Sequence, residues 1–279
     1  MREQGLLLRK SRNLIFVILL FLLSLFIAVP MFLILFYMFS KGLPALNFFL
    51  FTEVTKSVGV IQSGVLNAII GSFMLVLIAS IIAIPIGVLL GVFMSEFSRS
   101  RLAFSLRFSM DVLQGVPSII VGVVAYSWLV LPMKSFSALS GGVALSIMML
   151  PYIARCTEET LNLVPKTYKE AALALGVPYR VILIKVLLRI GSPGVLSGVI
   201  LSIARISGET APLLFTAFGN QFLTFNLLEP VHALPLVIFN YAMSPYEDWQ
   251  SIAWGAALLL ILFIFLLSII VKLINKRNC

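Results

Sequence analysis

Long runs without a charged residue divide the chain into apolar windows. The first window, Leu14–Ser40, holds 27 residues with no charge. A helix needs about 20 apolar residues to cross about 30 Å of hydrocarbon, so this window is long enough to span a membrane. It also exceeds the apolar core of a signal peptide, which is about 7–15 residues, and no small-residue cleavage site follows it. We therefore predict that this helix stays in the membrane as an anchor.

Five further apolar windows predict five more membrane-crossing helices. They lie within Ser57–Ser95, Val112–Met133, Ser135–Ala154, Pro193–Phe215 and Trp249–Val271. The sequence thus predicts an all-α protein with six transmembrane helices. The predicted organisation is an N-terminal segment (1–13), an anchor span (14–40), a five-span domain (57–272) that includes a polar loop (155–190), and a tail (273–279).

Prolines and glycines inside these windows indicate kinks and helix contacts. Each proline removes a backbone hydrogen bond, so we expect bends at Pro85, Pro117 and Pro151. Gly87 and Gly91 have the spacing that lets two membrane helices approach closely.

Composition agrees with a lipid environment. The chain is 61% hydrophobic and only 11% charged, and its mean hydropathy is +1.10. Soluble domains carry roughly 25% charged residues. The net charge of +9 is not gathered into a basic run with interleaved aromatic residues, so we expect the lipid bilayer, and not nucleic acid, as the partner of this surface.

The basic residues set the predicted orientation. The chain has 20 Lys and Arg residues. Sixteen lie in segments that would be on one side of the membrane, three lie in the alternate loops, and Arg205 lies inside a window. Basic residues collect on the cytoplasmic side of membrane proteins. Both termini and the loop 155–190 are therefore predicted to be cytoplasmic.

The residues that commonly bind metals are scarce. Cys156 and Cys279 are both predicted on the cytoplasmic side, where a disulfide does not persist, and no Cys-x-x-Cys pair exists. The single histidine, His232, has no second ligand nearby in the sequence. We expect no metal site, and we expect His232 to be a solvent-facing loop residue.

The loop between the fourth and fifth windows predicts a helical hairpin. In the segment Val164–Arg189, Pro165 can start a helix and Gly176 can end it in a left-handed conformation. Pro178 suits the start of a second helix. The first helix is rich in alanine, so its smooth outer surface can enter a groove on a partner protein.

Within this hairpin, Glu170, Ala171 and Ala172, with Gly176 six positions after Glu170, resemble the EAA loop of ABC importer permeases. The family's motif ends in a proline, where this chain has Arg189. Pro193 and Gly194 are expected to supply the helix break slightly later.

Longer blocks narrow the resemblance to the phosphate-specific permeases of the PstA family. They are LQGVPSIIVGV (113–123), LPYIARCTEETLNLVP (150–165), ARISGETAPLLFTA (204–217) and ALPLVIFNYAMSPYEDWQSIAWGAAL (233–258). The resemblance implies the type I ABC importer permease architecture, in a bacterial cytoplasmic (inner) membrane. It also implies that the EAA loop docks on a separate ATP-hydrolysing subunit.

The resemblance further implies a set of partners. These are a homologous second permease subunit, two ATP-binding subunits and an extracytoplasmic phosphate-binding protein. The chain has no G-x-x-x-x-G-K-[ST] loop that would cradle nucleotide phosphates. We therefore expect no cofactor on this chain and no enzymatic activity of its own, with ATP and Mg²⁺ held by the partner ATPase subunits.

Arg205 and Glu209 are charges inside the fifth window, where a charge costs about 2.5–3.5 kcal/mol on insertion scales. On one continuous helix, Gly198, Ser202, Arg205, Glu209 and Thr216 would share a face within about 60°. A planar guanidinium suits an oxyanion, so this face is a candidate substrate pathway. The alternative is a structural ion pair, because Arg205 and Glu209 are spaced to pair across one helical turn.

The predicted function is therefore a permease subunit that moves inorganic phosphate into the cytoplasm. Three alternatives stay open at this point. The cargo could be another oxyanion such as sulfate or molybdate. An ion-gradient-driven secondary transporter would instead show inverted repeats and more intramembrane carboxylates. A membrane-assembly subunit would use the loop only to anchor a soluble partner.

The orientation predicts which lysines a membrane-impermeant thiol reagent reaches after single replacement by cysteine. Cysteines at positions 56 and 134 should be labelled in intact cells, and cysteines at positions 10 and 169 should be labelled only after the membrane is opened. Labelling of position 169 from outside intact cells would contradict this topology.

Overall fold

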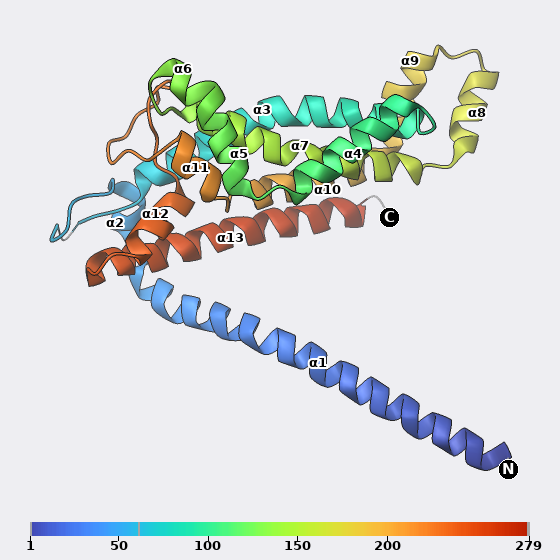
Figure 1. The fold of residues 1–279 in the computed structure, drawn as a ribbon, viewed down its shortest axis with the longest axis horizontal. Helices are drawn as coiled ribbons and strands as arrows, with labels where there is room; N and C mark the ends of the chain where they lie inside the picture. The colour runs from blue at the N-terminus through green and yellow to red at the C-terminus, as the bar shows by residue number, and fades with distance from the viewer. Residues whose placement is uncertain (1, 61, 278–279) are drawn as a thin grey trace.

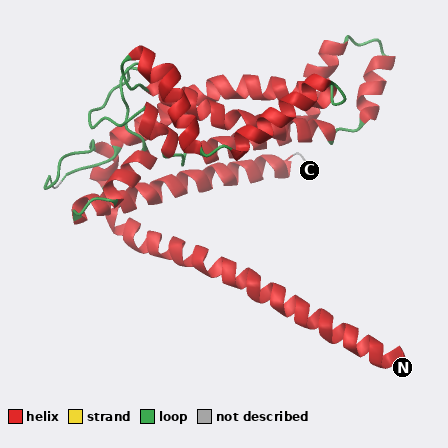
Figure 2. Ribbon diagram, in the orientation of Figure 1, coloured by secondary structure: helices red, strands yellow, loops and turns green. Residues whose placement is uncertain are grey.

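The computed structural model describes residues 2–60 and 62–277, and almost all of it is helical (Figures 1 and 2). Its long helices lie roughly along one direction, and the loops gather toward the two ends of the bundle. The elements are α1 (Arg2–Ala45), α2 (Phe48–Thr52), α3 (Leu66–Glu96), α4 (Arg101–Gly115), α5 (Ser118–Ala125), η1 (Tyr126–Val130), α6 (Leu131–Met133), α7 (Ala138–Asn162), α8 (Lys166–Ala174), α9 (Tyr179–Val181), η2 (Ile182–Leu187), α10 (Leu188–Ile206), α11 (Ala211–Thr216), α12 (Leu234–Ala242) and α13 (Glu247–Arg277).

The number of apolar helices agrees with the predicted spans. Within the described residues, five helices are long and apolar enough to cross a membrane, and a sixth span results if one bent pair counts as a single span. The chain therefore has the multi-pass, all-α fold that the apolar windows predict. Cys279 lies outside the described residues.

The third predicted window, Val112–Met133, contains the helical segment Ser118–Met133 and also a sharp bend, where the sequence predicts only a kink at Pro117. Val112 still belongs to α4, and the helical segment that follows it, Ser118–Met133, is bent by 103° from α4. Pro117 causes the break, because it has no N–H to donate and forces the preceding residue out of the helical region. Val116 accordingly has φ −71° and ψ 128°.

The fifth predicted span, Pro193–Phe215, is wrong at both ends. The helical segment begins earlier, at Tyr179, and ends at Ile206, before the separate short helix α11. Pro193 lies inside α10 and does not end it, so the helix break expected at Pro193 and Gly194 is absent from this part of the chain. Pro212 opposes continuation at the other end, since it would remove a hydrogen bond from an unbroken helix.

Glycines bring α3 and α7 into close contact. A Cβ added at Gly87 would lie 2.8 Å from Cβ of Ile153, and one added at Gly91 would lie 2.5 Å from Cβ of Thr157 and 2.6 Å from the Ala154 carbonyl oxygen. Backbone approach of this kind requires residues without side chains. Buried residues of both helices, such as Leu75 and Met149, form the main apolar core beside this contact.

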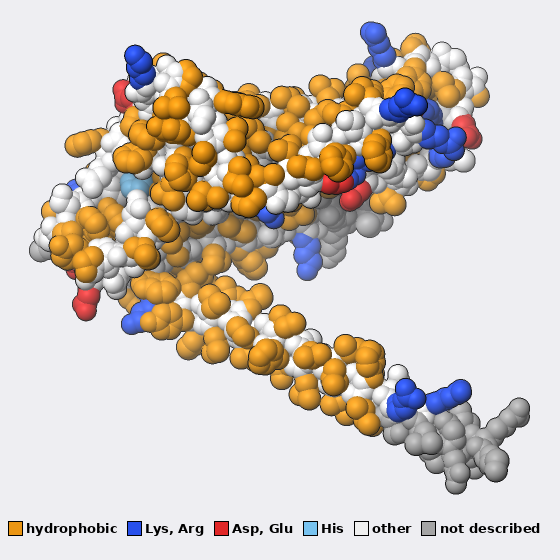
Figure 3. Space-filling model, viewed as in Figure 1, with side chains coloured by type: hydrophobic (Ala, Val, Ile, Leu, Met, Phe, Trp, Pro, Cys, Tyr) orange, Lys and Arg blue, Asp and Glu red, His pale blue; other side chains and the backbone are white. Residues whose placement is uncertain are grey.

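The first helix leaves the bundle (Figure 1). Near its C-terminal end α1 packs on α13, with the rings of Tyr37 and Trp254 5.3 Å apart and Gly42 against Leu258. The apolar window of α1 is otherwise 0% buried, and hydrophobic side chains cover it along its length (Figure 3). Such a surface is suited to lipid or to another apolar helix.

Ion pairs join α4 to α7 at the end of the bundle that carries α8. The buried carboxylate of Glu158 accepts hydrogen bonds from Arg107 and, at 3.1 Å, from Arg155. Arg155 also pairs with Asp111 of α4, and Arg107 donates to the Ser98 carbonyl oxygen at 3.0 Å. Because Arg107 of α4 pairs with Glu158 of α7, and Arg155 of α7 pairs with Asp111 of α4, this network fixes the crossing of α4 over α7.

The prediction for His232 is wrong, because the side chain is buried. It is 6% exposed, and its carbonyl oxygen lies directly against Gly71 of α3. Its Nδ1 accepts a hydrogen bond from the backbone N–H of Ala233 at 3.2 Å. Burial lowers the pKa of His232 to about 4, so the imidazole is neutral at pH 7.

The close contact of α3 with α7 predicts that Gly91→Ala destabilises the protein. The added methyl group meets the Ala154 backbone, which cannot move aside as a flexible side chain could. We expect a loss of about 1–3 kcal/mol, measured as a lower melting temperature of the purified protein in detergent. Gly115→Ala is the matched control, because nothing lies within 4 Å of the new methyl group. Equal melting temperatures for the two variants would contradict the prediction.

Candidate functional site

The helical hairpin of residues 163–178 projects from one end of the bundle, with α8 at its tip (Figure 1). Pro165 is the N-cap of α8, and Gly176 has φ +73°. The N–H of Gly176 donates to the Leu173 carbonyl at 2.9 Å, and that of Val177 donates to the Ala172 carbonyl at 3.2 Å. These two bonds form a Schellman motif, so the predicted left-handed end of the helix is confirmed.

The hairpin presents a free surface at the positions that resemble the EAA motif. Glu170 and Ala171 are exposed, whereas Ala172 is 9% exposed and faces the bundle. Around them, Leu163 and Leu175 are more than four-fifths exposed. Exposed leucines beside a smooth, alanine-rich helix are typical of a docking surface for another protein.

The second candidate site is Arg205, in the last turn of α10. Its guanidinium carbon lies 4.3 Å from the ring centroid of Tyr152, close to the middle of α7, and the side chain is exposed. Stacking holds one face of the planar guanidinium and leaves the N–H groups at its edges free to donate. The site therefore places a charged guanidinium, positioned by Tyr152, beside the middle of a membrane-spanning helix.

Glu209 does not pair with Arg205, although both residues are among those that the structure describes. It is half-buried and lies in the linker after α10, where its N–H donates to the Ile206 carbonyl at 3.1 Å. The helix ends before Glu209, so the geometry of two residues one helical turn apart is lost. The structural ion pair considered from the sequence is not formed in this chain.

Ser202 and Thr216 do not share a helix face with Glu209, so that prediction is wrong. Both residues are buried. The Ser202 hydroxyl donates to the Gly198 carbonyl at 2.7 Å, and the Thr216 hydroxyl donates to the Pro212 carbonyl at 2.8 Å. Each hydroxyl therefore donates within its own helix. The pathway role of Arg205, Glu209, Ser202 and Thr216 stays a prediction.

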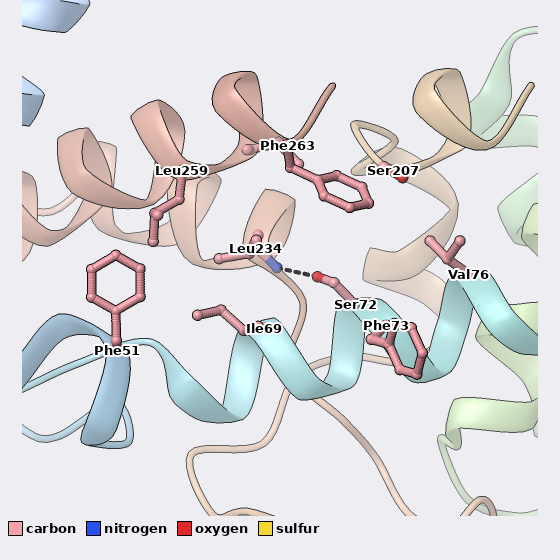
Figure 4. A pocket seen from close by; sticks show the side chains of 10 residues that line it. Phe51, Ile69, Ser72, Phe73, Val76, Ser207, Leu234, Leu259 and Phe263 are labelled. Carbon is pink, nitrogen blue, oxygen red and sulfur yellow. Dashed lines mark hydrogen bonds between the residues drawn. The ribbon is translucent and has the colours of Figure 1, made fainter. Parts of the chain in front are cut away.

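A cavity of about 300 Å³ lies between α3, α12 and α13 (Figure 4). Its walls are mainly apolar. The hydroxyl oxygen of Ser72 accepts a hydrogen bond from the backbone N–H of Leu234 at 2.8 Å. No charged residue lines it, so this cavity does not suit an anion. Among the described residues, no group of three or more His, Cys, Asp or Glu could hold a metal ion.

Tyr152 is the site residue that sequence reasoning missed. Arg205 and Tyr152 are far apart in the chain, and only the packing of α10 on α7 brings them together. A polar aromatic residue after Pro151 in an apolar window was the one available signal.

The fold is that of the membrane subunits of ABC importers. A chain of the MetNI methionine ABC transporter, solved in an inward-facing conformation, superposes with a TM-score of 0.61 at 20% identity, over 76% of this chain and 93% of that chain. An amino acid ABC transporter gives a TM-score of 0.51 at 17% identity, over 76% and 94%.

Sequence comparison then gives the family. The model of the binding-protein-dependent transport system inner membrane component matches residues 83–278. The PstA phosphate transport permease of Haemophilus influenzae is 44% identical over 88% of this chain and 87% of that protein. The PstA of Yersinia pestis is 42% identical over 88% and 83%, and a probable PstA of Methanocaldococcus jannaschii is 37% identical over 92% and 91%. The chain belongs to the PstA family of ABC importer permeases, which are transport subunits and not enzymes.

The left-handed turn at Gly176 predicts that Gly176→Val displaces α8. A β-branched residue at positive φ costs about 1–3 kcal/mol, so the hairpin should change shape and bind the expected ATPase subunit less well. Co-purification with that subunit in mild detergent measures the loss. Gly59→Val is the matched control, since Gly59 also has positive φ (+85°) in open space but lies far from the hairpin. Equal co-purification of both variants would show that the turn at Gly176 is not needed for docking.

Proposed function

We propose that this chain is a permease subunit of an ATP-driven importer that moves inorganic phosphate across the cytoplasmic membrane. The observation that carries the proposal is the 42–44% identity to PstA phosphate transport permeases over most of the chain. The exposed guanidinium of Arg205 supplies a chemical reason for an anionic cargo.

The proposal includes partners that complete the importer. A homologous second permease would close the pathway, two ATPase subunits would bind ATP and Mg²⁺, and an extracytoplasmic protein would deliver phosphate. The exposed side of α8, around Glu170 and Ala171, is the proposed contact with one ATPase subunit. Both termini and this hairpin would then lie in the cytoplasm, as the distribution of basic residues predicts.

Arg205 is proposed to act as a transient anion ligand. The N–H groups of a guanidinium match two oxygens of a tetrahedral oxyanion, and Tyr152 limits the rotation of the group without occupying its donors. A pathway must also release its cargo. A single arginine binds an anion more weakly than a cluster of cations would, which suits passage.

Glu209 offers a reason for phosphate over sulfate. At neutral pH inorganic phosphate still carries a proton that can be donated to a carboxylate, whereas sulfate and molybdate are fully ionised. A carboxylate oxygen can accept a hydrogen bond from a protonated oxyanion, whereas a fully ionised oxyanion has no proton to donate to it. Membership of an importer family argues against a secondary transporter and against a mere assembly subunit.

We expect Arg205→Gln to lower phosphate uptake at least about ten-fold, because a charged donor contributes about 1.5–3 kcal/mol. Arg205→Lys should retain part of the uptake, since lysine keeps the charge but loses the planar fork. Tyr152→Leu should lower uptake about two- to ten-fold through loss of stacking, and Tyr152→Phe, which keeps the ring, is the matched control.

Uptake is measured in vesicles and normalised to the amount of assembled complex, with sulfate and molybdate as competitors. The double variant Arg205→Gln with Glu209→Gln separates the pathway role from a structural one. Near-normal uptake by the double variant would show that Arg205 is only structural. Wild-type uptake of sulfate in preference to phosphate would overturn the choice of cargo.

A further inference from the structure

Lys169 lies where three elements of the bundle meet. It belongs to α8, and its ammonium forms an ion pair with Glu96, the last residue of α3. The ammonium also donates a hydrogen bond to the hydroxyl of Tyr179 at 3.0 Å, and it lies 5.0 Å from the centroid of that ring. Tyr179 begins the helical segment that leads into α10. One side chain therefore joins the hairpin to two membrane-spanning helices.

The ion pair is partly shielded from water. The Glu96 side chain is 11% exposed and that of Lys169 is 30% exposed. Burial alone would lower the pKa of Lys169, but the hydrogen bonds and charge interactions with Glu96 and Tyr179 together outweigh it and the pKa is raised. The ammonium thus stays charged at neutral pH, and a shielded charge pair holds its geometry better than an exposed one.

Apart from packing against η2, little else connects α8 to the bundle. Among its residues only Ala172 is buried, and short loops at residues 163–165 and 175–178 flank the helix. Over the part of the chain that the structure describes, Lys169 makes the side-chain hydrogen bonds that lead out of α8. A polar cavity of about 360 Å³ separates much of α8 from the ends of α3 and α7, with Ser95, Asn162 and Glu170 among its lining residues.

The end of α3 is in turn fixed to α7. The Ser95 hydroxyl donates a hydrogen bond to the Asn162 side chain at 2.9 Å. Further along α3, Gly87 and Gly91 lie directly against α7. A displacement of Glu96 therefore cannot stay local, because closely packed helices move together. The same α7 carries Tyr152, against which Arg205 is stacked.

We infer that the Lys169–Glu96 ion pair transmits movement of the α8 hairpin to α3 and α7, and so couples ATP hydrolysis on a partner subunit to opening of the pathway. This inference rests on the proposed function and adds a positioning residue to it. Lys169 and Glu96 bind neither cargo nor nucleotide. Their role is to prevent α8 from moving into the polar cavity while the membrane helices stay still.

The test measures phosphate taken up per ATP hydrolysed by the whole complex in vesicles. Lys169→Met should lower this ratio at least about five-fold, because a coupling free energy of about 1 kcal/mol or more is lost. Glu96→Gln should lower it similarly while leaving the exposed side of α8 unchanged. The charge exchange Lys169→Glu with Glu96→Lys should restore the ratio to within about two-fold of wild type. Lys185→Met is the matched control, since Lys185 is an exposed lysine without an ion pair among the described residues.

Two outcomes would overturn the inference. A wild-type ratio in Glu96→Gln would show that α3 receives no movement through this pair. A ratio that falls in Lys169→Met but is not restored by the charge exchange would place the action of Lys169 on the ATPase subunit itself. The two proposals fail separately, because a wrong cargo abolishes phosphate uptake by the wild type, whereas a wrong transmission route leaves wild-type uptake intact.

Discussion

The close contact between α3 and α7 is the constraint on which the other features depend. Gly87 and Gly91 let the two backbones approach, and the main apolar core forms beside them. Each candidate site is attached to this pair of helices. Arg205 is stacked on Tyr152 of α7, and the α8 hairpin is held by Glu96 at the end of α3. A change in the angle between α3 and α7 would therefore alter both sites together.

Prolines decide where the helices of this bundle stop. Pro117 separates α4 from α5, and Pro212 prevents α10 from continuing into α11. Inside a membrane, irregular backbone is tolerated only where protein covers it or where it borders a water-filled space. The linker after α10 carries Glu209, so the break puts this carboxylate outside the helix that carries Arg205. An unbroken helix would instead have paired the two charges on its own surface.

Much of the fold could be predicted from the sequence, because each apolar window and each turn depends on nearby residues. The spans, and the left-handed end of α8 at Gly176, follow from local composition and backbone sterics. The failures involve contacts between distant segments. The burial of His232 depends on Gly71 of α3, and the stacking of Arg205 depends on Tyr152. Hydropathy also could not locate the end of α10, because Leu213 and Leu214 are as apolar as the residues within the helix.

The exposure of Arg205 bears on how the importer must be assembled. Its guanidinium lies beside the middle of α7, yet no carboxylate among the described residues of this chain pairs with it. An unpaired cation at that depth is too costly to face lipid. It must therefore face a water-filled path, an anion or another protein surface. Arg205 is exposed on this chain, and the proposed second permease is the surface that would cover it. The placement of a single charge thus supports the proposal of a second membrane subunit.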